Sequence, residues 1–233
     1  MILFFDKRIG ETMDEMISRF RQKYSIDNKT KVAYAGRLDP LAFGKIIILT
    51  DKDIYDKEKY CGKDKTYTTW ILQGIQTDTY DIMGKITSKN IWEPVYNGVE
   101  EFEYEQQYPM YSSIYVIQDG IRKPLWYYEK NNIKVVNMPS KKVKLISGEK
   151  ITDDISISST ELLRLIKDRI DLVKKDTYRQ DEIIALWQEK LKDDNYIISK
   201  WKFTITSGGY IRYLANKMGG CCYDIERISY HDT

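Results

Sequence analysis

The sequence AGRLDPLAFG at residues 35–44 runs into the apolar sequence IIIL at residues 46–49, and we expect the fold to be organised around this stretch. Four consecutive aliphatic residues predict a buried strand. The glycines permit backbone conformations that are closed to other residues, and Pro40 biases Asp39 toward an extended conformation. The stretch therefore predicts a carboxylate held in a fixed direction beside a rigid strand, although an Asp-Pro pair beside glycine is also typical of an ordinary turn.

Length and composition indicate a globular protein with a sizeable core. The chain has 233 residues and a mass of 27.6 kDa, with 42% hydrophobic, 13% aromatic and 31% charged residues, which excludes a disordered or membrane-spanning chain. The opening sequence MILFF meets charged residues at positions 6–8, so it predicts a first strand rather than a signal peptide. We therefore expect an intracellular protein, in the cytoplasm, with a nuclear location left open.

Cysteine and histidine usage limits the chemistry that the chain can perform. The cysteines Cys61, Cys221 and Cys222 lack metal-site spacing, so we expect reduced thiols, no disulfide and no metal site. The single histidine, His231, lies near the C-terminus, where fraying is usual, so a mechanism that needs a histidine base is disfavoured. The net charge of +2 indicates a polyanionic partner only weakly.

Periodicity predicts a strand-rich chain with several helices. Thr12 and Glu15 have the spacing of a capping box, and apolar residues at helical spacing continue to Tyr24, before a loop over residues 25–34. Strands are predicted at residues 65–72, from 85, and at 111–117, 133–136, 143–146 and 201–206. Helices are predicted at 162–173 and 183–191, as a hairpin within residues 158–194, and at 210–218, ended by Gly219-Gly220.

Four motifs follow one another in a recognisable order. The first is the sequence GRLDPLAFG at 36–44, and the second combines KTY at 65–67 with GIQTDTYDIMG at 74–84. The third consists of Gln106, Pro109, Tyr111 and Ser112, and the fourth is GYIRYL at 209–214. In this order they resemble the TruB family of RNA pseudouridine synthases, and Lys7, Gly10 and Thr12 also fit the family's opening. The resemblance covers residues 1 to about 150 and 198–230, and it leaves the helical hairpin unmatched.

The resemblance implies a fold and an activity. The fold is α+β, with a central, mostly antiparallel mixed sheet flanked by helices, in a single catalytic domain over residues 1–233 with a helical insertion at 158–194. We expect no C-terminal PUA domain, because the chain ends about where the catalytic domain of the family ends. The implied activity is isomerisation of uridine to pseudouridine in RNA, at uridine 55 in the T-loop of tRNA, by a monomer that needs no cofactor and no metal.

The resemblance also assigns site residues. Asp39 is the nucleophile, which attacks the ribose, attacks the uracil ring or removes a ribose proton, and these three mechanisms stay open. Arg212 pairs with the carboxylate, and Tyr67 stacks on the flipped uracil and assists proton transfer. Substrate contacts are expected from Tyr34, Arg37, Leu38 and Lys65. For Asp78 and Asp81 a structural role in a turn ranks ahead of a catalytic one.

The chain departs from the family pattern at several positions. Tyr34 stands where the family usually has histidine, and Arg37 stands where a small residue is usual, so Arg37 could share or replace the ion-pairing role of Arg212. Tyr108 replaces a proline of the third motif, and Tyr115 stands where lysine is common.

These departures leave alternatives open for the function. One is an RNA-binding or RNA-folding protein on the same scaffold with little catalysis. Another is a synthase that acts on a different RNA, alone or guided by partners. The mixed charges of the hairpin at 158–194 fit an RNA contact or an ordinary solvated face.

Overall fold

The computed structural model describes residues 1–91, 100–175, 178–192 and 194–232 of the chain. The strands are β1 (Ile2–Lys7), β2 (Val32–Ala35), β3 (Ala42–Thr50), β4 (Asp64–Thr77), β5 (Ile86–Ile91), β6 (Phe102–Gln107), β7 (Tyr115–Gln118), β8 (Ile121–Pro124), β9 (Ser140–Lys150), β10 (Ile155–Ser158), β11 (Asn195–Ile205) and β12 (Gly220–His231). The helices are α1 (Met13–Tyr24), the short 3-10 helix η1 (Asp51–Asp56), α2 (Lys57–Cys61), α3 (Leu125–Lys130), α4 (Ser159–Ile170), α5 (Gln180–Lys190) and α6 (Ile211–Lys217).

Strand β3 contains the apolar run at 46–49 and is covered on both faces. Ile46 and Ile48, on one face, pack with α1 in a core that contains Phe20. Ile47 and Leu49 point the other way and pack against residues of β2, η1 and α2. A strand buried on both faces needs apolar residues at every position rather than at alternate ones, which explains the continuous run.

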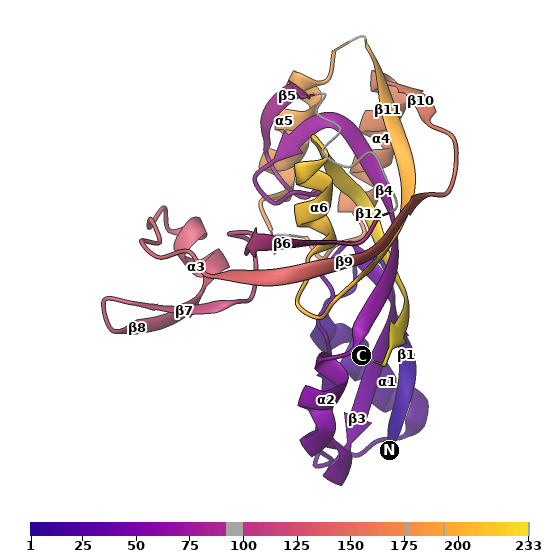
Figure 1. Cartoon of the computed structure of the whole chain (residues 1–233), viewed down its shortest axis with the longest axis vertical. Helices are drawn as coiled ribbons and strands as arrows, with labels where there is room; N and C mark the ends of the chain where they lie inside the picture. Colours follow the sequence, from indigo (N-terminus) through magenta and orange to yellow (C-terminus); the bar gives the residue numbers. More distant parts are fainter. Residues whose placement is uncertain (92–99, 176–177, 193, 233) are drawn as a thin grey trace.

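Ten of the described strands form one twisted sheet that runs along the long axis of the molecule (Figure 1). The order is β1-β3-β12-β4-β11-β9-β6, while β2 pairs with β3, β5 with β4 and β10 with β11. Neighbouring strands are antiparallel, except that β12 runs parallel to β3, with Ile225 opposite Ala42. The predicted α+β class and mostly antiparallel mixed sheet are therefore confirmed.

The helices cover two parts of this sheet. In Figure 1, α1 and α2 lie beside β1 and β3, whereas α4, α5 and α6 surround β4, β11 and β12 at the other end. Leu162, Ile166 and Ile170 of α4 and Trp187 of α5 are fully buried in one core with Leu72 of β4. The predicted helical hairpin is confirmed.

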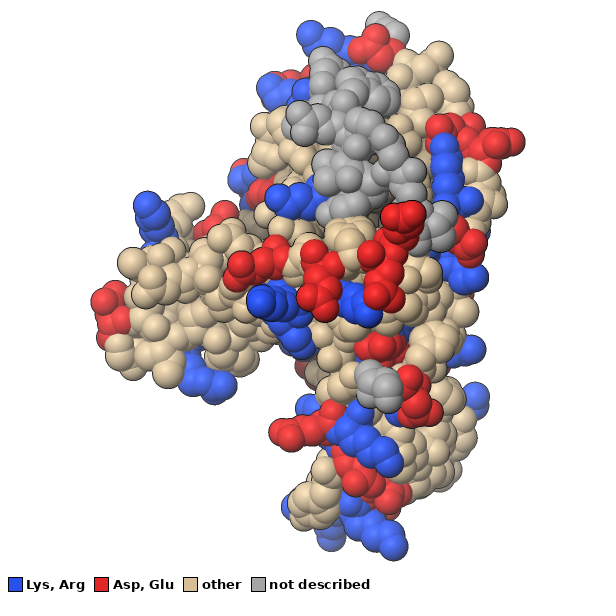
Figure 2. Space-filling model, in the orientation of Figure 1, with Lys and Arg blue, Asp and Glu red and all other residues tan. Residues whose placement is uncertain are grey.

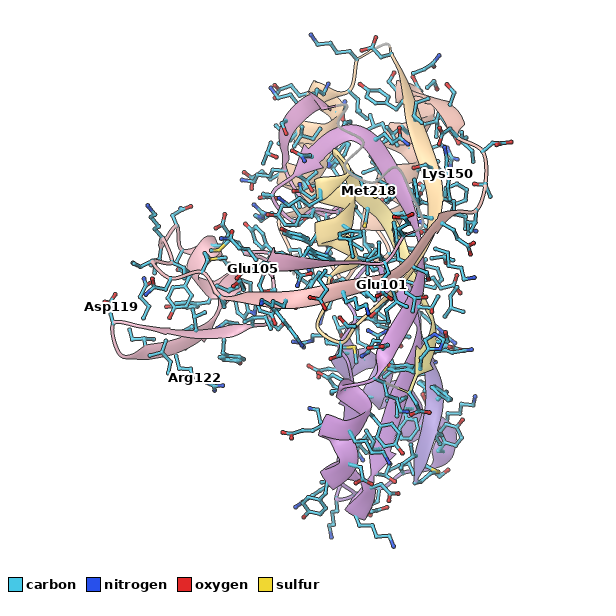
Figure 3. All side chains as sticks on the ribbon, in the orientation of Figure 1. Glu101, Glu105, Asp119, Arg122, Lys150 and Met218 are labelled. Carbon is cyan, nitrogen blue, oxygen red and sulfur yellow. The ribbon has the colours of Figure 1, made fainter. Side chains whose placement is uncertain are left out.

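The strands β7 and β8 form a separate hairpin that projects from the sheet together with α3, and Asp119 and Arg122 lie at its far end (Figures 1 and 3). The face of the molecule in Figure 2 interleaves Lys and Arg with Asp and Glu and shows no broad patch of one sign. Among the described residues, no helix has the length and apolarity needed to cross a bilayer.

The capping box that begins α1 is confirmed. The backbone N–H of Glu15 donates to Thr12 Oγ1 at 3.2 Å, and the backbone N–H of Thr12 donates to Glu15 Oε2 at 2.8 Å. This reciprocal pair satisfies two donors that the first turn of a helix otherwise leaves free.

Several predicted elements are wrong. Residues 133–136 contain no strand, β7 begins only at Tyr115 within the predicted strand 111–117, and β2 lies at the end of the predicted loop. The largest error is at the C-terminus, where β12 follows α6 directly. His231 does not fray, because it pairs with Asp64 in the sheet register and its Nε2 lies 2.7 Å from Thr66 Oγ1. Part of the aperiodic segment at 88–107 lies outside the described residues.

Candidate active site

Asp39 lies between β2 and β3 on the wall of a cavity of about 920 Å³. This volume is within the range of about 300–1,000 Å³ that small-molecule sites occupy. Its wall is built from the loop before β3, the turn after β4, the segment after β6 and the connection between α4 and α5. Leu38, Asp39, Asp81, Tyr111, Arg179 and Arg212 are among the residues that line it. Asp39 is accessible from this cavity, with 34% of its side chain exposed.

Arg212, in the first turn of α6, forms an ion pair with Asp39. Its Nε lies 2.8 Å from Asp39 Oδ2, although the geometry is not that of an aligned hydrogen bond. The guanidinium also donates to the carbonyl oxygens of Thr79 and, at 3.2 Å, of Tyr111, and only 3% of the side chain is exposed. Burial alone would lower the pKa of Arg212, but the charges of Asp39 and Asp81 hold that pKa above its ordinary value. The arginine is therefore a fixed cation behind an accessible carboxylate.

Asp81 is a second carboxylate beside the same guanidinium. Its Oδ2 lies 3.7 Å from Arg212 Nε, while Oδ1 accepts hydrogen bonds from Thr79 Oγ1 at 2.6 Å and from the backbone N–H of Met83 at 3.0 Å. Burial raises the pKa of Asp81 to about 6, against the opposing effect of Arg212. The sequence analysis favoured a turn role for Asp81 and did not predict its contact with Arg212. The presence of two acids in the motif TDTYD was the signal that could have suggested it.

Asp78 has the structural role that was expected of it. Its Oδ1 accepts from the backbone N–H of Lys85 at 2.8 Å, which closes the turn after β4. Its Oδ2 pairs with Arg179 Nη1 at 2.9 Å. Both carboxylate oxygens are thus occupied within the protein.

Lys7 holds the backbone that follows Asp39. Its Nζ donates to the carbonyl oxygens of Pro40 at 2.9 Å, Ala42 at 2.7 Å and Arg8 at 3.1 Å, and the residue is 1% exposed. Burial lowers the pKa of Lys7 to about 8, although the charge of Asp39 opposes this shift. Three carbonyl acceptors around one ammonium fix the turn that carries the carboxylate.

Arg227 of β12 holds the backbone that precedes Asp39. Its Nη1 donates to the carbonyl oxygen of Gly36 at 2.8 Å and its Nη2 to that of Arg37 at 3.1 Å. Gly44 allows this strand to approach, because it has a φ of 97° and a side chain there would collide with the carbonyl group of Arg227. Sequence reasoning missed Arg227, since no local pattern reveals which strand lies beside β3.

The predicted site residues fall into two groups. Arg37, Leu38, Asp39 and Arg212 all line the cavity. The ion pair with Asp39 belongs to Arg212, whereas Arg37 Nη1 donates to Ser113 Oγ at 2.7 Å. Arg37 therefore does not replace Arg212 in this structure.

The other three predicted residues lie away from the cavity wall. Tyr67 of β4 is 6% exposed, and its hydroxyl accepts a hydrogen bond from Arg227 Nε at 3.3 Å. Lys65 is also 6% exposed and donates from Nζ to the carbonyl oxygen of Cys61 at 2.9 Å. Tyr34 is half-buried on β2 beneath Lys57 Nζ, which lies 5.5 Å from its ring centroid. Of the three, Tyr67 is linked to the loop of Asp39 through Arg227, which donates to the carbonyl oxygens of Gly36 and Arg37.

The described residues contain no group of three or more His, Cys, Asp or Glu side chains that could hold a metal ion, and Cys61, Cys221 and Cys222 are free thiols. Burial raises the pKa of Cys222 above its ordinary value, so it packs as an apolar residue rather than as a thiolate.

The fold and the site define an α+β domain in which a buried arginine presents a carboxylate to a cavity. The sequence model described as "TruB family pseudouridylate synthase (N terminal domain)" matches residues 21–163, and the chain belongs to this family. The match includes Asp39 and Tyr67 and ends inside α4, before Arg212 and most of the helical hairpin.

Curated relatives and a solved structure agree with this assignment. The chain is 31% identical over 156 residues to tRNA pseudouridine synthase B of Mesoplasma florum, covering 63% of this chain and 51% of the relative. It is 27% identical over 180 residues to the protein of the same name from Syntrophotalea carbinolica, covering 71% and 56%. The chain thus spans about half the length of these relatives. A chain of a Cbf5-Nop10-Gar1 complex matches at a TM-score of 0.52 and 13% identity, over 98% of this chain and 48% of that one, which shows the shared fold.

Proposed function

We propose that the chain isomerises uridine to pseudouridine in RNA, with Asp39 as the nucleophile and uridine 55 in the T-loop of tRNA as the target. The observation that carries this proposal is the ion pair between accessible Asp39 and buried Arg212 on the cavity wall. Membership of the TruB family and relatives named tRNA pseudouridine synthase B support the reaction and the class of RNA. A monomer acting on tRNA would work in the cytoplasm.

The site has groups suited to this chemistry. The reaction breaks the bond between ribose and uracil, keeps the free base in place, and rejoins it through carbon. A carboxylate that attacks the ribose or the ring, or that removes a ribose proton, must be ionised and must point at the substrate. Arg212 balances the negative charge and fixes one oxygen, while the exposed part of Asp39 faces the cavity.

The target base must leave its stack to reach Asp39. Extruding a base costs a few kcal/mol, which contacts in the pocket offset. Leu38 and Arg37 line the cavity and are proposed to contact the entering nucleotide. Tyr67 keeps its proposed role of stacking on the uracil, but its ring is buried and does not line the cavity, so the surrounding chain must move when RNA binds. Tyr34 and Lys65, which also do not line the cavity, stay predicted RNA contacts.

Replacing Asp39 with asparagine tests the proposal. Asp39→Asn removes the nucleophile while keeping the shape of the side chain, so we expect product formation in a tRNA transcript to fall by roughly a thousandfold or more. Binding of the transcript and the far-UV circular dichroism should change little. Asp168→Asn is the matched control, because Asp168 lies on the exposed face of α4 and pairs with Arg164. Pseudouridine formed by Asp39→Asn at the wild-type rate would refute the assignment of the nucleophile.

A second candidate is an RNA-binding protein on the same scaffold with little catalysis. The buried position of Tyr67 favours it, since a base cannot stack on that ring in the structure as it stands. Binding of the transcript by the wild-type protein, without any product, would support this candidate over the first.

A further inference from the structure

The connection between α4 and α5 forms one wall of the Asp39 cavity. Lys175, Tyr178, Arg179, Gln180 and Ile183 all line the same space as Asp39 and Arg212. The family match ends at residue 163, so this wall comes from a part of the chain that the match does not include. Its contribution to the site must therefore be judged from its own contacts.

The side chain of Gln180 forms hydrogen bonds with described residues on both sides of the connection. Gln180 Nε2 donates to the carbonyl oxygens of Val173 at 3.1 Å and Lys174 at 2.8 Å. The Oε1 of the same side chain accepts from the backbone N–H of Tyr178 at 3.1 Å. One buried amide thus joins the end of α4 to the start of α5.

Arg179 links the connection to two of the motif segments, through Asp78 and Tyr111. Its guanidinium pairs with Asp78 in the turn after β4 and lies 4.4 Å from the centre of the Tyr111 ring. The carbonyl group of Tyr111 accepts a hydrogen bond from Arg212, the partner of Asp39. Arg179 is therefore a positioning residue for the wall.

The connection also packs against the loop before α1. A side chain at Gly10 would collide with the carbonyl group of Leu172, which follows α4. The backbone N–H of Gly10 donates at 2.9 Å to the carbonyl oxygen of Pro40, the residue after Asp39. The wall and the catalytic loop are thus linked through one glycine.

The outer charges of the hairpin do not point to RNA binding. Arg164 pairs with Glu161 and Asp168 on α4, each at 2.7 Å, and all three side chains are about half exposed. Exposed pairs of this kind neutralise one another, so Arg164 contributes no net positive charge to this face. We therefore look for an RNA contact of the hairpin on the side that lines the cavity.

Tyr178 is the residue on that side suited to such a contact. It lines the cavity and is 40% exposed. Burial of part of the ring, followed by the charge of Asp39, raises the pKa of its hydroxyl, while Arg37 lowers it, so both residues lie within electrostatic reach. Exposed aromatic rings are the surfaces on which proteins stack unpaired bases.

We infer that Tyr178 is a substrate-binding residue on which an unpaired base of the RNA stacks as it enters the Asp39 cavity. This inference rests on the proposed function, because it takes RNA as the ligand. The hydrogen bond from the backbone N–H of Tyr178 to Gln180 Oε1 is present before RNA arrives, which reduces the ordering that binding requires.

The test uses a stem-loop RNA with the sequence of a tRNA T-arm. Stacking of a base on an aromatic ring contributes about 1–3 kcal/mol, so Tyr178→Ala should weaken binding of this RNA by roughly 5- to 150-fold. Tyr178→Phe keeps the ring and should restore most of the affinity. Tyr55→Ala is the matched control, since Tyr55 is 80% exposed on η1 and does not line the cavity.

Binding and product formation are measured separately, so that the inference and the proposed function can fail independently. An affinity of Tyr178→Ala equal to that of wild type and Tyr55→Ala overturns the inference, even if pseudouridine forms. Weaker binding by Tyr178→Ala with rescue by Tyr178→Phe supports it, even if no pseudouridine forms. Equal losses in the Ala and Phe variants overturn stacking, and absence of RNA binding by the wild type overturns both proposals.

Discussion

Two carboxylates share one guanidinium, and their exposure separates their roles. Asp39 has 34% of its side chain exposed and faces the cavity, whereas Asp81 has 12% exposed and is hydrogen-bonded within its own turn. A nucleophile must reach its substrate, and a counter-charge need not. This difference supports the proposal that Asp39 is the nucleophile, and we infer that Asp81 fixes Arg212.

The buried position of Asp81 predicts a dependence of stability on pH. Its pKa is raised from 3.8 to about 6 in the folded protein, so the folded state holds this proton more tightly than the unfolded state does. The stabilisation is complete below about pH 4 and is lost as the pH rises through about 6. The free energy of unfolding of the wild type should therefore fall relative to Asp81→Asn by up to about 3 kcal/mol between pH 4 and 7, because each pKa unit corresponds to about 1.4 kcal/mol.

Urea denaturation of both proteins at several pH values measures this difference. Asp224→Asn is a companion variant at a separate position, because burial also raises the pKa of Asp224 to about 6. It should show a change of the same sign. A difference between wild type and Asp81→Asn that stays constant from pH 4 to 7 would contradict the assignment of a raised pKa.

The α4–α5 hairpin shows what periodicity can predict and where it stops. Apolar spacing predicted helices at 162–173 and 183–191, close to the observed Ser159–Ile170 and Gln180–Lys190. It could not predict that their connection lines the Asp39 cavity. That placement depends on contacts between distant residues, such as the bond at 3.1 Å from Trp187 Nε1 to the carbonyl oxygen of Gly84.

Trp187 should therefore stabilise both the hairpin and the site. Trp187→Ala leaves a cavity at a fully buried position and should lower the free energy of unfolding by about 3–5 kcal/mol. Trp187→Phe keeps most of the packing but leaves the carbonyl group of Gly84 without this donor, which should cost about 1–3 kcal/mol. Chemical denaturation measures both effects, and equal stability of the Ala and Phe variants would show that packing of this ring is unimportant.

At the scale of the whole molecule, the sequence predicted the class of sheet but not its order. The apolar run at 46–49 and the strand at 65–72 were recognisable because their residue types are typical of strands. The strand β12 was missed, although it lies between β3 and β4. Its position is fixed by non-local pairing, and it brings Arg227 under the loop of Asp39.

The same limit applies to the site. The motifs identified Asp39 and Arg212, which are more than 170 residues apart in the sequence. The fold places Arg212 Nε 2.8 Å from Asp39 Oδ2. They also suggested Tyr67 as a wall of the pocket, yet its ring is buried beside Arg227 and does not line the cavity. Lys7 was recognised only as part of the family's opening, and Arg227 and Tyr178 carried no recognisable local signal, because their contacts with the Asp39 loop and cavity arise only in the folded chain.

The most direct test of the account is release of tritium from a tRNA transcript that carries tritium at carbon 5 of uridine. Forming the new bond from ribose to this carbon displaces its hydrogen, so every isomerisation releases a label into water. We predict that the purified wild-type protein alone releases the label from a single uridine of the T-loop and that Asp39→Asn releases it at roughly a thousandth of the wild-type rate or less. Absence of release by wild-type protein that binds the transcript, or release by Asp39→Asn at the same rate as wild type, would contradict it.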